Sequence, residues 1–221
     1  TNTVRFSSNA IIGGNSNGTV LFDGKMAEVI FYKQGLNNAQ RVIVQNYLSA
    51  KYDIAIQDDK YNFGTFHGND VAGIGRVGDD RHTAAMSSNI LKISSASSLD
   101  DGDFALFGHD NADTAAWVTT ETPNAGENIE RIAREWRFDA TNDVGSVTVS
   151  IDASNLPELN AGFTVYMLML DVDGDFTSGV TYYPLSNTTG SIYEASGVTI
   201  PDQSYMSLAV VKPVIQFATT S

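Results

Sequence analysis

The sequence predicts a mainly β protein, an antiparallel β-sandwich of jelly-roll or immunoglobulin-like type with one short helix. Short runs of β-branched and aromatic residues are separated by clusters of Gly, Asn, Asp, Ser and Thr, which favour turns. One such run, residues 145–151, places Val147, Val149 and Ile151 at alternate positions with hydroxyl residues between them. This alternation is typical of an antiparallel strand with one face in a core and the other in water. Clear helical periodicity occurs only at residues 37–51.

The strand-like runs recur at intervals that suit the two sheets of a sandwich. In chain order, the segments expected to be strands are residues 3–8, 25–33, 89–94, 104–108, 129–139, 145–151, 164–170, 180–184 and 205–211. The second of them has apolar side chains on both alternating faces, as expected for a strand buried between two layers.

The helix expected at residues 37–51 has a start signal and one apolar row. Asn37 is a natural N-cap, and the Gln40 amide stands three residues later, where it can reach back to the N–H of the cap. Val44, Leu48 and Tyr52 recur at every fourth position on one face. We therefore expect the helix to pack against a sheet through these three side chains.

Residues 22–56 combine the pattern F-D-G-x-x-A-E-V-x-x-Y with a short turn and a helix that ends Y-L-x-x-K-Y. This combination resembles the C-terminal end of the LamG, or concanavalin A-like, jelly-roll modules of large secreted bacterial proteins. The resemblance implies that residues 1–57 are the last strands and closing helix of such a module, in incomplete form.

Two further resemblances cover the rest of the chain. Residues 58–212, with DVAGIGR at 70–76 and RIAREWR at 131–137, are similar to the β-rich unit that follows such jelly rolls in bacterial surface proteins. Residues 213–221 resemble the opening of a Calx-β repeat, a module of giant adhesins. Together the resemblances imply a non-catalytic module of a large bacterial surface adhesin, extracellular and either structural or ligand-presenting. Its expected partners are neighbouring domains of the same polypeptide and surface glycans.

Composition narrows the classes of function. The formal net charge of −13 argues against a nucleic-acid partner, because phosphate binding requires a basic surface. The same charge suits bound divalent cations. The lack of cysteine excludes disulfides and thiolate metal sites. No apolar run approaches the roughly 20 residues of a membrane-spanning helix, so no membrane insertion is expected.

Two short motifs match enzyme signatures, but the residues around them do not predict the structure that each signature requires. Residues 73–78 satisfy G-x-G-x-x-G, but no apolar strand precedes them, so we expect a glycine-rich turn and no dinucleotide site. Residues 14–18 satisfy G-x-S-x-G, but strand-like residues follow, so we expect a hairpin loop and no serine nucleophile. The paired carboxylates of a jelly-roll glycosidase are also missing as an E-x-D-x-E string. No enzyme activity is therefore expected.

One acidic run has the spacing of a metal site. Asp171, Asp173 and Asp175 follow the strand at residues 164–170 and alternate around Gly174. Three carboxylates in this pattern can converge on a hard cation, which prefers oxygen ligands. Calcium is the cofactor that the run suggests, and a solvated acidic turn is the alternative interpretation.

Aromatic side chains in polar segments are candidates for ligand contact. Trp117 lies within DNADTAAWVTTETPN, where an exposed aromatic would suit a binding surface. Tyr61, Phe66 and His67 lie together in another loop. Trp136 is interpreted either as a core residue or as a platform for a sugar ring. Two alternatives therefore stand beside the adhesin module, namely a carbohydrate-binding module and an accessory domain of a secreted hydrolase.

Overall fold

The computed structural model describes residues 11–15, 17–123 and 127–213. The chain forms two compact units, which divide between Asn37 and Asn38. No helix among the described residues is both long and apolar enough to cross a membrane.

The described part of the first unit contains a small hairpin-like turn. An antiparallel bridge joins Gly14 to Leu21. Within the turn, the side-chain oxygen of Asn15 accepts a hydrogen bond from the N–H of Thr19 at 2.9 Å. This part of the chain agrees with the hairpin loop expected at residues 14–18, of which residue 16 lies outside the described residues.

Residues 25–33 form no strand, so that prediction is wrong. The side chains of Met26, Val29 and Phe31 are 49%, 45% and 60% exposed. A strand is stable when a neighbour pairs with its backbone, and apolar residues on both faces contribute only when a layer covers each face. Neither condition is met by the described residues of this unit. The strand expected at residues 3–8 lies outside the described residues.

The second unit is a sandwich of two antiparallel sheets, which confirms the expected fold class. The larger sheet has the order β11-β10-β14-β8-β5-β1-β2, with β7 paired to β14 and β6 paired to β7. Its strands are β1 (Asn69–Val77), β2 (Asp80–His82), β5 (Phe104–His109), β6 (Trp117–Val118), β7 (Ile129–Ile132), β8 (Trp136–Thr141), β10 (Val165–Asp171), β11 (Thr181–Pro184) and β14 (Tyr205–Val211).

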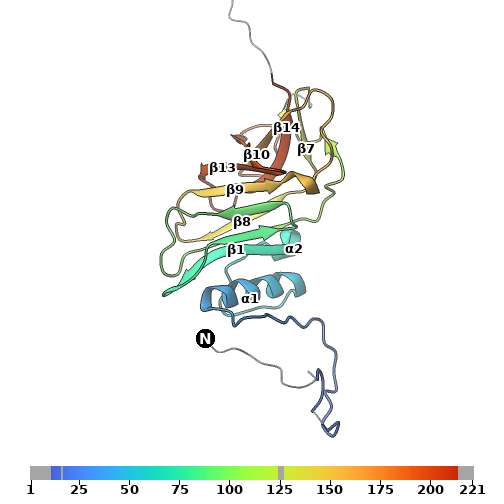
Figure 1. Cartoon of the computed structure of the whole chain (residues 1–221), viewed down its shortest axis with the longest axis vertical. Helices are drawn as coiled ribbons and strands as arrows, with labels where there is room; N and C mark the ends of the chain where they lie inside the picture. Colours follow the sequence, from blue (N-terminus) through green and yellow to red (C-terminus); the bar gives the residue numbers. More distant parts are fainter. Residues whose placement is uncertain (1–10, 16, 124–126, 214–221) are drawn as a thin grey trace, which may run out of the picture. The chain divides into compact units, whose positions relative to one another are not determined.

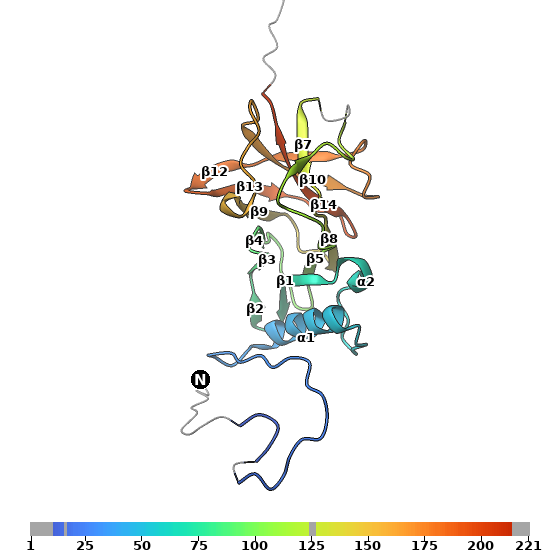
Figure 2. The same ribbon diagram turned by 90° about the vertical axis from the view of Figure 1, so that its right-hand side faces the viewer.

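The smaller sheet has the order β12-β13-β9-β4-β3. Its strands are β3 (Ala84–Ser87), β4 (Leu91–Ser94), β9 (Val147–Asp152), β12 (Ser186–Thr189) and β13 (Ile192–Val198). In Figure 2 the two layers stand side by side, with β3 and β4 in one layer and β5 and β8 in the other. The core between them contains the largest buried side chains, including Trp136, Phe107 and Phe138. Trp136 is therefore a core residue.

The helix α1 (Asn38–Tyr52) covers the outer face of the larger sheet and lies along β1 (Figure 1). Its buried residues are Ala39, Ile43 and Asn46. The expected packing against a sheet is present, but the row of Val44, Leu48 and Tyr52 is only half-buried, so the predicted contact face is wrong. The small side chain of Ala39 lies on the contact face, where it permits a close approach of helix and sheet.

Strand β5 shows why the sandwich needs this helix. All six of its residues are buried. Ala105 and Phe107 face the core between the sheets, whereas Phe104 and Leu106 pack with Ile43 of α1 on the opposite side. The compact unit therefore begins at Asn38, and the expected boundary between residues 57 and 58 lies inside it. Of the expected Calx-β segment at residues 213–221, all but Pro213 lies outside the described residues.

The string at residues 73–78 is a strand rather than a glycine-rich turn, because all but its last residue belong to β1. A Cβ atom at Gly73 would lie 2.8 Å from the carbonyl oxygen of Ala105, and one at Gly75 would overlap the Phe104 ring. The glycines thus provide room for the side chains of β5, which pairs with β1. Only Gly78, with φ of +58°, serves the turn that follows.

The segment 129–139, expected as one strand, is divided into β7 and β8. Both pair with β14, β7 opposite Ala209–Val211 and β8 opposite Tyr205 and Met206. Between them, the Ser207 hydroxyl donates to the carbonyl oxygen of Arg134 at 3.0 Å. The side chain therefore satisfies a backbone group where the ladder is interrupted.

Candidate functional site

The structure places Trp117 in the interior, so its predicted exposure is wrong. Its side chain is 9% exposed, and its indole N–H donates to the carbonyl oxygens of Pro157 and Glu158 at 3.3 and 3.2 Å. Its ring lies 6.2 Å from the ring of Tyr166. The polar sequence around Trp117 belongs to the ends of β6, whereas the indole itself fills the core.

The three candidates of the other loop do not form one surface. Tyr61 is buried, its hydroxyl donates to the carbonyl oxygen of His67 at 2.8 Å, and burial raises its pKa. Phe66 is 78% exposed. The half-buried His67 packs edge-on against Tyr205, and burial lowers its pKa. Both Phe66 and His67 belong to α2 (Gly64–His67).

A cleft of about 1060 Å³ lies next to this loop, between the C-terminal part of α1 and the adjoining ends of β1 and β5. Tyr61 is the only one of the four proposed ligand contacts that lines it. Tyr47 and Tyr52 of α1 add two more aromatic rings. The acidic and amide side chains that line the cleft are Asp53, Asp59, Asn62, Asn69, Asp70 and Asn111.

Buried Asn46 connects α1 to the segment that forms one wall of the cleft. Its side-chain N–H₂ donates to the carbonyl oxygen of Asp58 at 3.0 Å and to that of Val42 at 2.9 Å. Its side-chain oxygen accepts the N–H of Lys60 at 2.6 Å. A single buried amide thus satisfies three backbone groups, and it fixes the path of the chain toward Tyr61.

A second connection joins the same wall to the larger sheet. The backbone N–H and side-chain N–H₂ of Asn62 donate to one carboxylate oxygen of Asp139, at 2.6 and 3.0 Å. Burial raises the pKa of Asp139, and the two hydrogen bonds from Asn62 oppose that rise. The cleft wall is therefore held by polar contacts with α1 and with β8, although it contains little regular structure.

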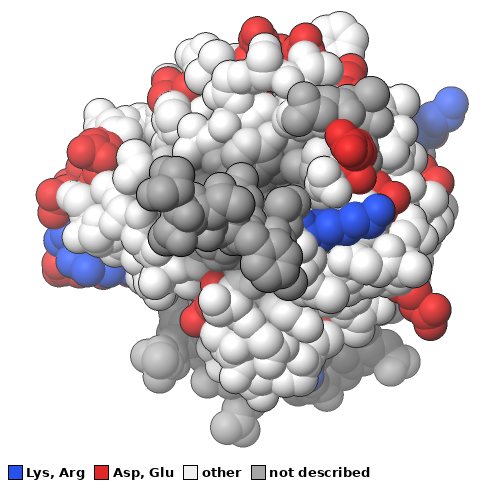
Figure 3. Space-filling view, turned by 90° about the horizontal axis from the view of Figure 1, so that it is seen from above, with Lys and Arg blue, Asp and Glu red and all other residues white. Residues whose placement is uncertain are grey.

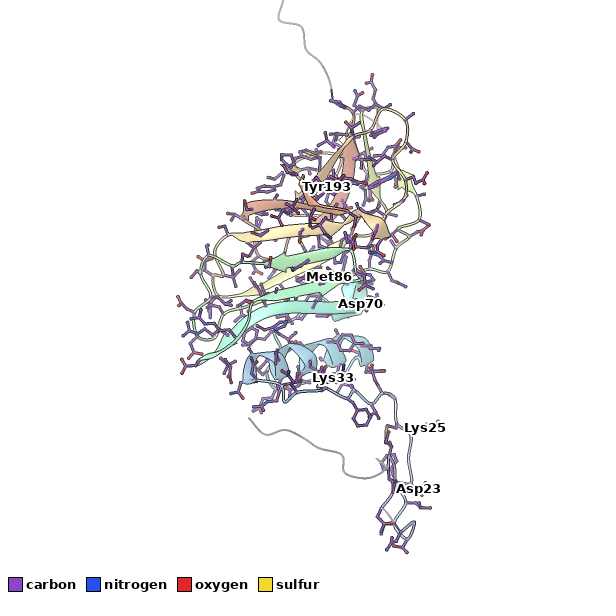
Figure 4. The ribbon with its side chains drawn as sticks, in the orientation of Figure 1. Asp23, Lys25, Lys33, Asp70, Met86 and Tyr193 are labelled. Atoms are coloured by element: carbon purple, nitrogen blue, oxygen red, sulfur yellow. The ribbon has the colours of Figure 1, made fainter. Side chains whose placement is uncertain are left out.

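Asp70 and His109 meet at the floor of the cleft, where β1 and β5 pair. Asn69 stands opposite His109 in the ladder, and the register shifts between Asn69 and Ala72. Asp70 lies within this bulge at φ of +45°, a left-handed conformation that is uncommon outside glycine. Figure 4 places Asp70 at the end of β1. Its carboxylate oxygen lies 3.6 Å from Nε2 of His109.

The proton on the neutral ring of His109 can be assigned from its hydrogen bonds. Nδ1 accepts the backbone N–H of Asn111 at 2.9 Å, so the proton resides on Nε2. Burial lowers the pKa of His109, with the Arg134 guanidinium acting in the same direction and Asp70 opposing it. Since the only available lone pair of the ring is already used, His109 presents an N–H donor and the exposed carboxylate of Asp70 presents an acceptor.

The acidic run at residues 171–175 forms a chain of local turns. Asp171 is buried, and one of its oxygens accepts the N–H groups of Asp173 and Gly174, both at 2.8 Å. Asp173 accepts the N–H of Asp175 at 2.9 Å. Burial raises the pKa of Asp171, whereas this N–H lowers the pKa of Asp173. Within residues 11–15, 17–123 and 127–213, no three His or acidic side chains are grouped as ligands for one ion.

Sequence reasoning missed the residues that the fold brings together at the cleft floor. One signal was available, because the polar residues 109–111 directly follow the strand expected at residues 104–108, whereas residues 69–70 precede a string that was expected to be a turn. Their meeting depends on the pairing of β1 with β5, which joins residues 40 positions apart, as in the hydrogen bond from Asn69 to the carbonyl oxygen of His109.

Comparison with known proteins returns one family model. Its description is Domain of unknown function (DUF8202), and it matches residues 78–204. Searches of curated proteins and of solved structures found no match. The matched range runs from the turn after β1 to the residue before β14, and it includes His109 and Asn111 of the cleft. Because the model matches more than half of the chain, the protein belongs to the DUF8202 family.

Proposed function

We propose that this chain is a non-catalytic carbohydrate-binding module of an extracellular protein, with the cleft beside α1 as its binding site. The observation that carries this proposal is the lining of the cleft, which combines carboxylates and amides with three tyrosines. Sugar hydroxyls both donate and accept hydrogen bonds, so they suit Asp and Asn side chains, while tyrosine provides an apolar face with a polar edge. A concave site with a few polar groups that fix orientation is the usual form of a small-ligand site.

The hydrogen bonding of His109 supports a role as a donor to a ligand rather than as a base. His109 has no free lone pair, because Nδ1 accepts the N–H of Asn111. Asp59 uses one carboxylate oxygen to accept the N–H of Tyr61 at 3.1 Å. His109 is thus not a free proton acceptor, and a test for turnover decides whether the carboxylates of the cleft act as an acid and a base.

The location at the bacterial surface rests on the three sequence resemblances. Within a large adhesin, the module would present the cleft to surface glycans and space the neighbouring domains of the polypeptide. An acidic exterior suits such a solvated module, and Figure 3 displays acidic side chains around one face of the molecule. An accessory domain of a secreted hydrolase would use the same cleft to hold its polysaccharide near a catalytic domain.

The direct test is binding of the purified chain to an array of oligosaccharides, followed by calorimetry with the ligands that bind. Asn111→Gly should weaken binding at least tenfold, because it removes an exposed amide from the cleft while glycine retains the left-handed φ of 65°. Asn142→Gly is the matched control, since Asn142 has a φ of 61° and does not line the cleft. Absence of binding to every glycan would reject the carbohydrate proposal, and turnover of a bound glycan would reject its non-catalytic part.

A further inference from the structure

We propose that Asp70 and His109 form a hydroxyl-recognition pair that makes the cleft selective for neutral, hydroxyl-rich sugars over acidic ones. This inference rests on the proposed function, because it names the ligand class of the same cleft. It assigns specificity to two residues rather than to the cleft as a whole.

Asp70 stands in an irregular part of β1. Its left-handed φ and the bulge around it take its carboxylate out of the regular alternation of β1. Asn111 follows the end of β5, and its backbone N–H donates to Nδ1 of His109. Its φ is +65°. Asp and Asn adopt a left-handed φ more readily than other non-glycine residues, and here two such residues flank one imidazole.

The imidazole N–H of His109 lacks a hydrogen-bond partner within the described structure. His109 is 2% exposed, and its Nε2 is buried and unpaired. The 3.6 Å separation from the Asp70 carboxylate is longer than a hydrogen bond. A buried donor without a partner is destabilising. The N–H of His109 therefore gains a partner only when the Asp70 carboxylate turns and a ligand group enters beside it.

A hydroxyl group has the chemistry that this pair lacks. Its oxygen can accept the Nε2–H of His109 while its proton is donated to the carboxylate of Asp70. The side chain of Asp70 is 60% exposed, so it can turn to admit the incoming group. A ligand carboxylate or sulfate could accept from His109 but has no proton to donate to Asp70.

The charges that line the cleft also favour neutral sugars over acidic ones. Asp53, Asp59 and Asp70 line it, against the single cation Lys51. The ammonium of Lys51 already donates to the hydroxyl of Tyr47 at 2.8 Å. An anionic sugar would bring further negative charge to this surface, and such repulsion discriminates between ligands.

The experiment compares binding of neutral and acidic oligosaccharides to the full chain and two variants. The neutral probes are maltotetraose, cellotetraose, mannotetraose and chitotetraose, and the acidic probes are tetragalacturonate and a heparin tetrasaccharide. Asp70→Asn retains the size of the side chain and a residue that tolerates left-handed φ, but it removes the charged acceptor. Asp79→Asn is the control, because it removes the same charge from the turn at the other end of β1.

The wild-type chain should bind at least one neutral probe and bind the acidic probes at least tenfold more weakly. Asp70→Asn should weaken the neutral interaction at least tenfold, whereas Asp79→Asn should change it less than twofold. In nitrogen-15 NMR spectra, the Nε2–H signal of His109 should shift when the neutral probe is added. This readout does not depend on any substitution and reports directly on the imidazole.

The outcomes separate the two proposals. Binding of a neutral probe that is unchanged by Asp70→Asn would overturn the hydroxyl pair and leave carbohydrate binding intact. An equal or stronger affinity for the acidic probes would overturn the selectivity. A His109 signal unmoved by a bound sugar would show that only water occupies the pair. If no oligosaccharide binds, the proposed function and this inference fall together.

Discussion

Individual glycines on β1 leave room for side chains of the neighbouring strand β5. Gly75 pairs with Phe104, whose ring occupies the space that a Cβ atom would need. Phe104 in turn packs under α1 with Ile43 and Tyr61. The glycine thus allows one aromatic side chain to fill the space between helix and sheet.

Gly75→Ala should lower the free energy of unfolding by about 1 to 3 kcal/mol, because the added methyl group must displace the Phe104 ring. Urea denaturation measures this change. Gly78→Asn is the matched control in the turn after the strand, where a Cβ atom meets no atom within 4 Å and asparagine tolerates a positive φ. Equal stability of Gly75→Ala and the wild type would contradict the packing argument.

A buried arginine contacts two glutamates, and the carboxyl group of one of them has a raised pKa. Arg131 pairs with Glu121 and, at 3.0 Å, with Glu135. Burial raises the pKa of Glu135 to about 7, although the Arg131 guanidinium opposes the rise. A carboxyl group whose pKa is raised in the folded state stabilises the fold most when it is protonated.

The raised pKa of Glu135 determines how the stability of the fold depends on pH. The stabilisation by Glu135 is complete below its ordinary pKa of 4.5 and is lost as the pH rises through about 7. Glu135→Gln resembles the protonated form at every pH, so the wild type should lose stability relative to the variant between about pH 5 and pH 8. Urea midpoints of both proteins across this range measure the difference. A difference that does not change with pH would show that the pKa of Glu135 is not raised.

At the scale of elements, α1 is fastened to the cleft wall by one amide. Asn46 is 1% exposed, and its side chain serves the backbone of Val42, Asp58 and Lys60. The wall contains little regular structure, so this side chain replaces the ladder or helix hydrogen bonds that regular structure would provide. Its removal would affect both stability and the shape of the cleft.

Asn46→Ala should lower the free energy of unfolding by about 2 to 3 kcal/mol, since it leaves buried backbone groups unpaired. Chemical denaturation measures this change, and hydrogen exchange at Lys60 should become faster because its N–H loses its acceptor. Gln45→Ala is the control, because Gln45 is exposed on the same helix. An unchanged Lys60 exchange rate would refute the role of the amide.

The acidic loop after β10 remains a predicted calcium site. One oxygen of Asp171 accepts two backbone N–H groups, so an ion would use its second oxygen together with the exposed carboxylates of Asp173 and Asp175. With a dissociation constant of about 10⁻⁴ to 10⁻³ M, calcium at about 10 mM would stabilise the fold by roughly 1.4 to 2.7 kcal/mol. Melting temperatures in calcium and in chelator measure this effect, and Asp173→Ala should abolish it. Identical melting curves would favour the solvated acidic turn.

Across the whole molecule, the sandwich and α1 belong to one compact unit. The helix covers Val71, Phe104 and Leu106 on the outer face of the larger sheet. Loss of the helix would expose these side chains to water, at a cost of about 1.5 to 3 kcal/mol for each large apolar side chain. The compact unit that begins at Asn38 is therefore expected to be the smallest stable part of this region.

Two truncated proteins test this boundary. A fragment of residues 38–221 should retain the melting temperature of the sandwich, whereas a fragment of residues 58–221 should melt at a lower temperature and self-associate. Calorimetry and analytical ultracentrifugation provide the two measurements. Equal stability of the two fragments would instead favour a domain boundary between residues 57 and 58.

Local patterns in the sequence predict the mainly β class of this protein and much of its secondary structure. The segment at residues 145–151 is a strand in which β-branched and hydroxyl residues alternate, and the apolar runs at residues 104–108 and 205–211 also form strands. The helix was predicted to within one residue at each end, since its periodicity is also local. Residues 25–33 show the limit of this reasoning, because the same composition forms no strand without covering layers.

The position of the candidate site depends on the tertiary structure. The glycines of β1 can be explained only by the packing of Phe104 against this strand. Trp117 is buried only because strands distant in sequence enclose it. The Asp70–His109 pair arises from the register between β1 and β5, which sets Asn69 against His109 and lets a bulge turn Asp70 toward the imidazole. Strand pairing depends on contacts between residues far apart in the chain, and local patterns in the sequence do not specify those contacts.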